Sequence, residues 1–381
     1  MAKIIFGSYI VRCPIGGMLA SSLQWLRGFQ QLGHDVYLVE KSGWPNSCFN
    51  PKKNVMGDDC SYGVKIVNDL LSSFELGNKW CYVDACDNYY GLDKKKVNEI
   101  FKTADLYIDW GAHGAWSHEA SKTQITIRIE GEPGRSQILM ENKLRNNEPI
   151  PDYDFYYSVG LNLGTGKSSA PTAGKKWGKI FHPVCVDLFQ VRPLGIGASF
   201  TTVMNWQSHD SVEYEGKVYG QKDIEFLKFI SLPKQVDSSI EIAVSGKDIP
   251  YSKLESYGWH IKNAHEATLS YNDYVNYIGN SKGEFSVCKN IFIETKSGWF
   301  SDRSAVYLAC GRPVVLQDTG FSSHLPCGMG LFAVKDVEEA ASAINEVNRN
   351  YRKHSEAARE IAEEFLDARK VLQKFLFEIN V

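Results

Sequence analysis

The stretch from residue 296 to residue 321, KSGWFSDRSAVYLACGRPVVLQDTGF, constrains the fold of this chain more than any other. It begins as a polar loop in which Ser301 or Asp302 is suited to cap a helix, because a short oxygen side chain accepts hydrogen bonds from the free amides of a first helical turn. The helix is predicted over residues 302–309, and Gly311 ends it. Loop, helix and strand in this order are typical of an α/β fold.

A buried strand is predicted directly after this helix. Residues 313–316, Pro-Val-Val-Leu, form a short apolar run bounded by turn residues, as expected of a parallel strand covered on both faces. Asp-Thr-Gly at 318–320 follows at the carboxyl end of the strand, where open α/β sheets bind ligands. A helix N-terminus carrying Ser301 and Arg303 attracts anions. The unit is therefore suited to a nucleotide diphosphate, although any capped helix in an α/β unit shows the same pattern.

Length and composition limit the number of domains and the class of protein. A chain of 381 residues is long enough for two domains, and its 43% hydrophobic and 23% charged residues are those of an ordinary globular protein. A net charge of −3 argues against broad non-specific binding to nucleic acid. No apolar run reaches the roughly 18 residues of a membrane helix, and the first residues indicate a strand rather than a signal peptide. The nine cysteines are scattered without a CxxC pair, so no zinc site or disulfide framework is expected, and a reducing cytoplasm is the expected location.

The chain opens with a βαβ unit. Strands are predicted over 3–6 and 35–40, with a leucine-striped helix over 18–32 between them. Gly16 and Gly17 precede the helix, and their backbone either lets a phosphate or sugar approach closely or simply forms a tight turn. The spacing is not GxGxxG, so the dinucleotide fingerprint is absent.

The rest of the chain continues the alternation on both sides of an irregular segment, 184–198, that is interpreted as an interdomain linker. The region 41–100 is interpreted as a variable insert near the cleft, with a helix over 64–74. Further strands are predicted over 104–110, 123–130, 153–159, 199–204, 240–244, 259–262, 284–287 and 330–334. Further helices are predicted over 223–230, 271–280, 337–348 and, as one long amphipathic helix, 355–378. Two α/β domains imply a cleft between them, which is a common place for a ligand.

Three segments together resemble the GT-B glycosyltransferases. Residues 16–36 combine a glycine pair, the leucine-striped helix and Gly-His before the second strand. Residues 284–321 include SGWFSDRS, LACGRPVV and DTGF, and this stretch resembles the donor half of bacterial and phage members. Residues 200–206, FTTVMNW, resemble the first strand of the second domain of that family.

The resemblance implies an α/β fold of two Rossmann-like domains facing across a cleft. The expected divisions are an acceptor-side domain over 1–190, a donor-binding domain over 191–355 and a C-terminal helix over 356–381 that crosses back to the first domain. The implied activity is metal-independent transfer of a sugar from a nucleotide sugar, with a UDP-sugar as the expected donor, to a hydroxyl acceptor.

The resemblance also implies which residues contact the donor. The leaving diphosphate would be neutralised by Arg303, Lys296 and the glycine turn. Asp318 would hold sugar hydroxyls. The base or the sugar would stack on Trp206 or Trp299. No metal ligand is expected, because the single Asp-x-Asp motif, 152–154, opens a predicted strand instead of ending one. The full expected donor set is Gly16, Gly17, Asn205, Trp206, Lys296, Ser297, Gly298, Ser301, Arg303, Asp318, Thr319 and Gly320.

A general base would come from the first domain. The candidates near the ends of predicted strands are Asp109, His113, Glu130 and Glu132, each of which has a capping or solvated role as its alternative. Retaining members of the resembled family often carry two glutamates with seven residues between them. Glu294 and Asp302 have that spacing, but the second is an aspartate, so the sequence leaves the stereochemistry open.

Other functional classes share parts of this pattern. A sugar-nucleotide epimerase of the same fold would convert the donor without an acceptor, and a phosphorylase would need only phosphate and a glycan. A non-catalytic protein would only bind the nucleotide. A Rossmann oxidoreductase would need the GxGxxG motif, which is missing. The acceptor is open among a small molecule, a glycan and a modified DNA base. The net charge does not favour DNA, and the one compact basic run of the first domain, 94–96, is also what a solvated helix start looks like.

Overall fold

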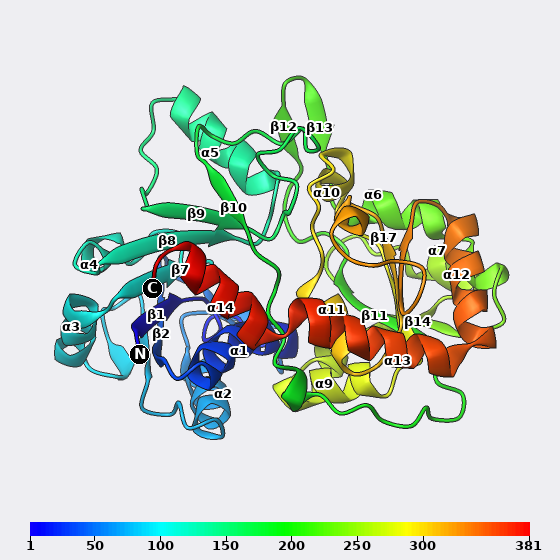
Figure 1. The fold of residues 1–381 in the computed structure, drawn as a ribbon, viewed down its shortest axis with the longest axis horizontal. Helices are drawn as coiled ribbons and strands as arrows, with labels where there is room; N and C mark the ends of the chain where they lie inside the picture. Colours follow the sequence, from blue (N-terminus) through cyan, green and yellow to red (C-terminus); the bar gives the residue numbers. More distant parts are fainter.

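The computed structural model describes residues 1–381, which form two α/β domains side by side (Figure 1). The first domain is built on an eight-stranded sheet in the order β10-β9-β8-β7-β1-β2-β5-β6, parallel except for the antiparallel edge strand β6. Its strands are β1 (Lys3–Gly7), β2 (Asp35–Lys41), β5 (Trp80–Val83), β6 (Tyr89–Gly91), β7 (Leu106–Asp109), β8 (Ile125–Glu130), β9 (Phe155–Ser158) and β10 (Trp177–Lys179).

The helices of the first domain follow the parallel strands as crossovers. They are α1 (Gly16–Gln31), α2 (Ser61–Ser72), α3 (Lys94–Thr103), α4 (Ser117–Ala120) and α5 (Arg135–Arg145), and a short antiparallel hairpin is formed by β3 (Cys48–Asn50) and β4 (Val55–Gly57). The region 41–100, interpreted as an insert, thus contains two strands of the main sheet. The basic run 94–96 lies in the first turn of α3, where Asp93 caps the helix through a 2.7 Å bond from the Lys96 amide.

The second domain has a six-stranded parallel sheet in the order β15-β14-β11-β16-β17-β18. Its strands are β11 (Phe200–Asn205), β14 (Ile240–Ser245), β15 (His260–Asn263), β16 (Gly283–Ser286), β17 (Val314–Gln317) and β18 (Leu331–Val334), with the antiparallel hairpin β12 (Val212–Tyr214) and β13 (Lys217–Tyr219). Its helices are α6 (Lys222–Phe226), α7 (Tyr251–Ser256), α8 (Ala264–Ala267), α9 (Tyr271–Gly279), α10 (Asn290–Glu294), α11 (Asp302–Ala309) and α12 (Val337–Arg349), with 3₁₀ turns η2 (Leu227–Phe229), η3 (Leu232–Lys234) and η4 (Phe321–Ser323). The 3₁₀ turn η1 (Val186–Leu188) lies in the segment that joins the two domains.

The C-terminal segment is not the single long helix predicted over 355–378. It consists of α13 (Tyr351–Ile361) along the second domain, the π-helical turn η5 (Ala362–Leu366) and α14 (Ala368–Glu378). Asp367, with φ −53° and ψ 126°, breaks the helix and caps α14 through the Arg369 amide. The linker fills the break, because the Val184 amide donates to the Leu366 carbonyl at 2.8 Å and the Val184 carbonyl accepts from the Ala368 amide at 2.9 Å.

The chain crosses back to the first domain at α14. Figure 1 shows α14, in red, lying over the first domain, where the C-terminus ends. The contact with α1 is close, since a Cβ atom at Gly28 would stand 2.6 Å from Leu372 and 2.9 Å from Ala368. The predicted GT-B arrangement of two Rossmann-like domains with a returning C-terminal helix is confirmed, while the boundaries 1–190, 191–355 and 356–381 stay predictions.

Candidate functional site between the two sheets

A cavity of about 640 Å³ lies between the two domains. Its walls are built from the loops that follow β1, β7 and β8 in the first domain and β11 and β14 in the second. Both sheets therefore direct the carboxyl ends of their parallel strands into one space, the position in which open α/β sheets bind ligands. The polar residues on its walls include Arg12, His113, Glu130, Glu132, Arg135, Asn205 and His209.

Three of the four predicted base candidates line this cavity, and Asp109 does not. Asp109 is buried and its carboxylate accepts from the His113 amide at 2.9 Å, the Gly114 amide at 2.8 Å and the Tyr153 hydroxyl at 2.6 Å. These bonds fold the loop after β7 into the turn that carries His113. His113 itself is exposed and adopts φ 50°, a left-handed conformation that the Asp109 bonds stabilise. Asp109 is thus a loop-forming carboxylate, which corrects its candidacy as a base.

Glu130, at the end of β8, is held as an anion. Burial by itself raises the pKa of its carboxyl. The Arg128 guanidinium, 2.8 Å away, and a hydrogen bond from Ser136 lower the pKa by more than burial raises it, so the pKa lies below its usual value. A carboxylate with a lowered pKa is a weak base. Its position, with one oxygen facing the Glu132 amide at 3.3 Å, suits it to orient the loop instead.

Glu132 lies opposite the second domain. Its two carboxylate oxygens lie 2.6 Å and 2.7 Å from Nζ of Lys289, the residue that precedes α10. The Glu132 side chain remains 33% exposed, whereas the Lys289 side chain is 11% exposed. This ion pair bridges the two domains at the edge of the cavity, and Glu132 is the most accessible of the three candidate carboxylates.

A second lysine near Lys289 has no carboxylate partner. Lys222, the first residue of α6, is 6% exposed, and burial lowers the pKa of its ammonium group to about 7. The nearby charges of Arg303 and Lys289 lower that pKa further, while Cys288 and Glu284 act in the opposite direction. Of these neighbouring cations, Arg303 is paired with Glu284 and Lys289 with Glu132, so Lys222 is the one buried cation of the group without an ion pair.

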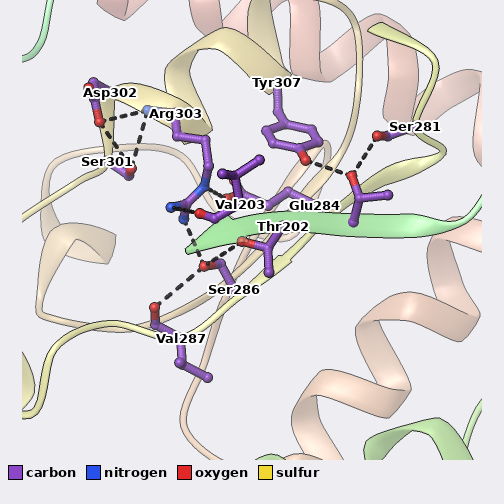
Figure 2. A network of polar contacts seen from close by, with 11 residues as sticks. Thr202, Val203, Ser281, Glu284, Ser286, Val287, Ser301, Asp302, Arg303 and Tyr307 are labelled. Carbon is purple, nitrogen blue, oxygen red and sulfur yellow. Dashed lines mark hydrogen bonds and ion pairs between the residues drawn. The ribbon is translucent and has the colours of Figure 1, made fainter. Parts of the chain in front are cut away.

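Arg303, predicted to bind the diphosphate, has another role. Figure 2 shows its guanidinium turned into the domain, where it donates to Glu284 at 2.6 Å, to the Val203 carbonyl at 2.9 Å and to the Ser286 hydroxyl at 2.7 Å. The Glu284 side chain is fully buried. Each of the three guanidinium nitrogens donates a bond within the second domain, so Arg303 ties α11 to β11 and β16, and its side chain does not line the cavity.

Most of the stretch 296–321 joins the domains instead of lining the cavity. The Gly298 carbonyl and the Ser297 carbonyl accept from the backbone amides of residues 161 and 162 at 3.4 Å and 3.0 Å. Asn162 also donates to the Lys296 carbonyl at 3.1 Å and meets Nε2 of His324 at 2.8 Å. The exposed side chain of Lys296 takes no part in these bonds.

Four further predicted donor positions are engaged in contacts with other parts of the chain. Ser301 caps α11 through the Arg303 amide, and the Thr319 hydroxyl donates to the Trp299 carbonyl at 2.6 Å. Asp318 forms the turn before η4, accepting from the Gly320 amide at 2.8 Å. Gly320 has φ 96° and lies where a Cβ would stand 2.6 Å from Nδ2 of Asn162. None of these four residues lines the cavity.

The glycine pair serves the domain contact. The Gly16 amide donates to the Thr268 carbonyl at 2.7 Å, and a Cβ at Gly16 would lie 2.4 Å from the Ser270 carbonyl oxygen. The close approach predicted at this turn is thus made by the second domain's own backbone. Gly17 is less constrained, since its nearest neighbour, in the Tyr274 ring, would be 3.6 Å from a Cβ.

The remaining predicted positions divide in two. Asn205, at the end of β11, is exposed and lines the cavity, whereas Trp206 is buried in the second domain's core and Trp299 packs against Phe292 at 4.8 Å between ring centroids. Neither tryptophan can stack on a ligand. The spaced acids Glu294 and Asp302 do not share a site, because Glu294 pairs with Lys217 at 2.7 Å and Asp302 borders a separate small cavity beside His182.

The sequence interpretation missed Arg135 and His209, which line the cavity, and Lys289 and Lys222, which lie near it without lining it. No sequence motif contains any of these four residues, Lys222, Lys289, Arg135 and His209. Only their positions after strands or at helix starts could have identified them as candidate site residues. No group of three or more His, Cys, Asp or Glu side chains is arranged to hold a metal ion. No helix has the length and apolar character needed to cross a membrane.

Comparison with solved structures bears on the fold. An α-glucosyltransferase in complex with UDP and a 13-mer DNA containing a HMU base superposes with a TM-score of 0.61 at 10% identity, and Anabaena Alr3699/HepE in complex with UDP and glucose with 0.59 at 12%, each over 100% of both chains. A glycosyltransferase from Rickettsia africae gives 0.55 at 13%, over 99% of this chain and 97% of the other. No family model and no curated protein matches the sequence. At such identities the likeness establishes the two-domain glycosyltransferase fold and not the activity.

Proposed function

We propose that this chain is a glycosyltransferase that moves a sugar from a UDP-sugar to a hydroxyl group of an acceptor. The observation that carries the proposal is the cavity into which the carboxyl ends of both sheets open, with Glu132 on its wall and Lys289 of the second domain paired with that carboxylate. The full-length likeness to solved structures that hold UDP supports the choice of nucleotide.

In this proposal the lysines of the second domain neutralise the leaving diphosphate. Lys222 is buried without a carboxylate partner, and Lys289 is paired only with a carboxylate that is itself a candidate for catalysis. A diphosphate between them would raise the pKa of Lys222 from about 7 by supplying the missing negative charge. In this proposal the two lysines, instead of a metal ion, stabilise the negative charge that develops on the leaving oxygen.

Glu132 is the proposed general base. When a diphosphate takes Lys289 as its partner, the Glu132 carboxylate is released from its ion pair and becomes free to accept the proton of the acceptor hydroxyl. Glu130 and Asp109 are already bonded within the first domain, and His113 is the second candidate on the same wall. Asn205 is the proposed donor contact retained from the sequence prediction.

The test is donor binding and turnover with the intact chain. Calorimetry with UDP and a panel of UDP-sugars should detect binding, and Lys222→Met should weaken UDP binding at least tenfold, while Lys253→Met, an exposed lysine on α7, should not. UDP release should depend on an added acceptor. Absence of UDP binding would refute the proposal, acceptor-free conversion of the donor would indicate an epimerase, and binding without release for any acceptor would indicate a non-catalytic nucleotide-binding protein.

Metal independence and a cytoplasmic location are two further parts of the proposal. Activity should persist after treatment with a chelator, as expected if Lys222 and Lys289 carry the charge of the diphosphate. A reducing cytoplasm remains the expected location on the basis of the nine scattered cysteines, all of which are free thiols in this structure.

A further inference from the structure

The mouth of the cavity has an apolar wall on the side of the first domain. It consists of Trp44, in the loop after β2, and of Phe49 and Met56 on the β3–β4 hairpin. Trp44 and Met56 are each 57% exposed, although both line the cavity. Large apolar side chains that are exposed together at a concave site are typical of a ligand-binding surface.

This apolar wall is held in place from behind. The Trp44 ring lies 5.0 Å from the Arg12 guanidinium, which is fixed by the buried carboxylate of Glu40 at 3.1 Å. Glu40 also accepts from the amides of Val11 and Arg12, so the support is rigid. Across the mouth, Phe49 packs against His265 of the second domain with 5.1 Å between ring centroids. The wall is therefore preformed, which reduces the entropy lost when a ring binds against it.

This wall is largely apolar and offers few hydrogen-bonding groups. Ser47 is bonded to Ser42 at 2.7 Å, and Nε of Arg12 donates to Glu40. A glycan would need several free donors and acceptors here, because its hydroxyl groups lose water on binding. A nucleic acid would need excess positive charge, yet Lys52 and Lys53 on the hairpin are balanced by Asp58 and Asp59 just beyond it.

We propose that the acceptor is a small hydroxylated aromatic molecule whose ring lies against Trp44, Phe49 and Met56. This inference rests on the proposed function and names the acceptor class of that site. The polar end of the same cavity, with Glu132, receives the hydroxyl group. In the transfer, the bond between the sugar's anomeric carbon and the diphosphate oxygen breaks with both electrons leaving on UDP. The acceptor oxygen bonds to that carbon, and its proton passes to Glu132.

A phenolic hydroxyl also suits the base. Its pKa of about 10 lies well below that of an alcohol, so less help from Glu132 is needed to form the nucleophile. Apolar burial and aromatic contacts with this wall both contribute to the affinity for such a ring.

The experiment compares three acceptors with one UDP-sugar donor: 2-naphthol, a linear oligosaccharide and duplex DNA containing a hydroxymethylated base. We expect UDP release and a glycosylated product with naphthol, and we expect Trp44→Ala to raise the naphthol KM about tenfold without changing UDP affinity. Trp44→Phe should restore most of the lost affinity. Phe377→Ala, which removes an exposed ring on α14 away from the cavity, is the matched control.

Transfer only to the oligosaccharide or only to the DNA would overturn the inference and leave the proposed function standing. An unchanged naphthol KM in Trp44→Ala would overturn it as well. Calorimetry of naphthol without donor gives an independent readout: Trp44-dependent binding supports the aromatic site even if no sugar is transferred, and naphthol binding that is absent or insensitive to Trp44 contradicts it.

Discussion

Lys289 Nζ lies 2.6 Å from Oε1 of Glu132, and this ion pair joins the second domain to the first at the edge of the cavity. Each partner is a group that the proposed reaction needs separately, the lysine for the diphosphate and the carboxylate for the acceptor. Since one lysine cannot fully neutralise both anions, donor binding should loosen the pair. Under the proposed function, binding of the nucleotide would release the base.

Replacing Glu132 by glutamine tests its role. Glu132→Gln keeps the size of the side chain but removes the proton acceptor, so kcat should fall by roughly 10²–10⁴-fold. UDP affinity should be unchanged or higher, because Lys289 loses its competing carboxylate. Steady-state kinetics and UDP calorimetry measure the two effects. Glu294→Gln, at a carboxylate that pairs with Lys217 outside the cavity, is the control and should keep full activity; equal loss in both variants would contradict the assignment.

Lys222 predicts an unusual dependence of stability on pH. Burial lowers its pKa to about 7 in the folded chain, whereas an unfolded lysine titrates near 10.4. Between these values the unfolded state binds more protons, so the stability contributed at this position rises with pH. The cost of burying the charge is greatest below pH 7 and is relieved as the pH rises towards 10.

Lys222→Met should therefore raise the midpoint of thermal unfolding, and it should do so more at pH 6 than at pH 9. Lys253→Met, at an exposed position, should change neither value. Thermal unfolding followed by circular dichroism at both pH values measures the difference. A gain that is the same at pH 6 and pH 9 would show that only packing, and not the buried charge, had changed.

Arg303 should matter for stability more than for donor affinity. Arg303→Met leaves the fully buried carboxylate of Glu284 without its cation, and one oxygen of Glu284 already lacks a hydrogen bond. Removing one partner of a buried pair costs about 3–5 kcal/mol. Denaturant unfolding should show this loss, and adding Glu284→Gln should recover part of it. A stable Arg303→Met chain that merely fails to bind UDP would favour the original interpretation from sequence.

The glycine pair offers a matched comparison. Gly16→Ala would place a Cβ 2.4 Å from the Ser270 carbonyl oxygen, while at Gly17 the nearest atom would be 3.6 Å away. We expect Gly16→Ala to destabilise the chain by about 1–3 kcal/mol, as overpacking does. Gly17→Ala should be neutral or slightly stabilising, because alanine favours a helix. Equal behaviour of the two variants in denaturant unfolding would contradict the domain contact at Gly16.

Local pattern was sufficient for most of the elements. The helix at 302–309, the buried strand after it and the strand ending at Glu130 are confirmed within a residue or two, because apolar periodicity and capping act over short distances. The long helix over 355–378 was wrong, because the break at Asp367 depends on the linker residue Val184 filling the gap. Periodicity alone cannot reveal such a partner.

The stretch 296–321 separates what sequence and tertiary structure each determine. Its residues by themselves specified a loop, a capped helix and a covered strand, since turn chemistry and burial of apolar side chains are local matters. They could not specify that Arg303 would turn inward to Glu284, nor that the loop would bond to Asn162 of the other domain. Only the tertiary structure decided which cations stay free, because a charge is paired or unpaired according to neighbours that the chain brings together from far apart.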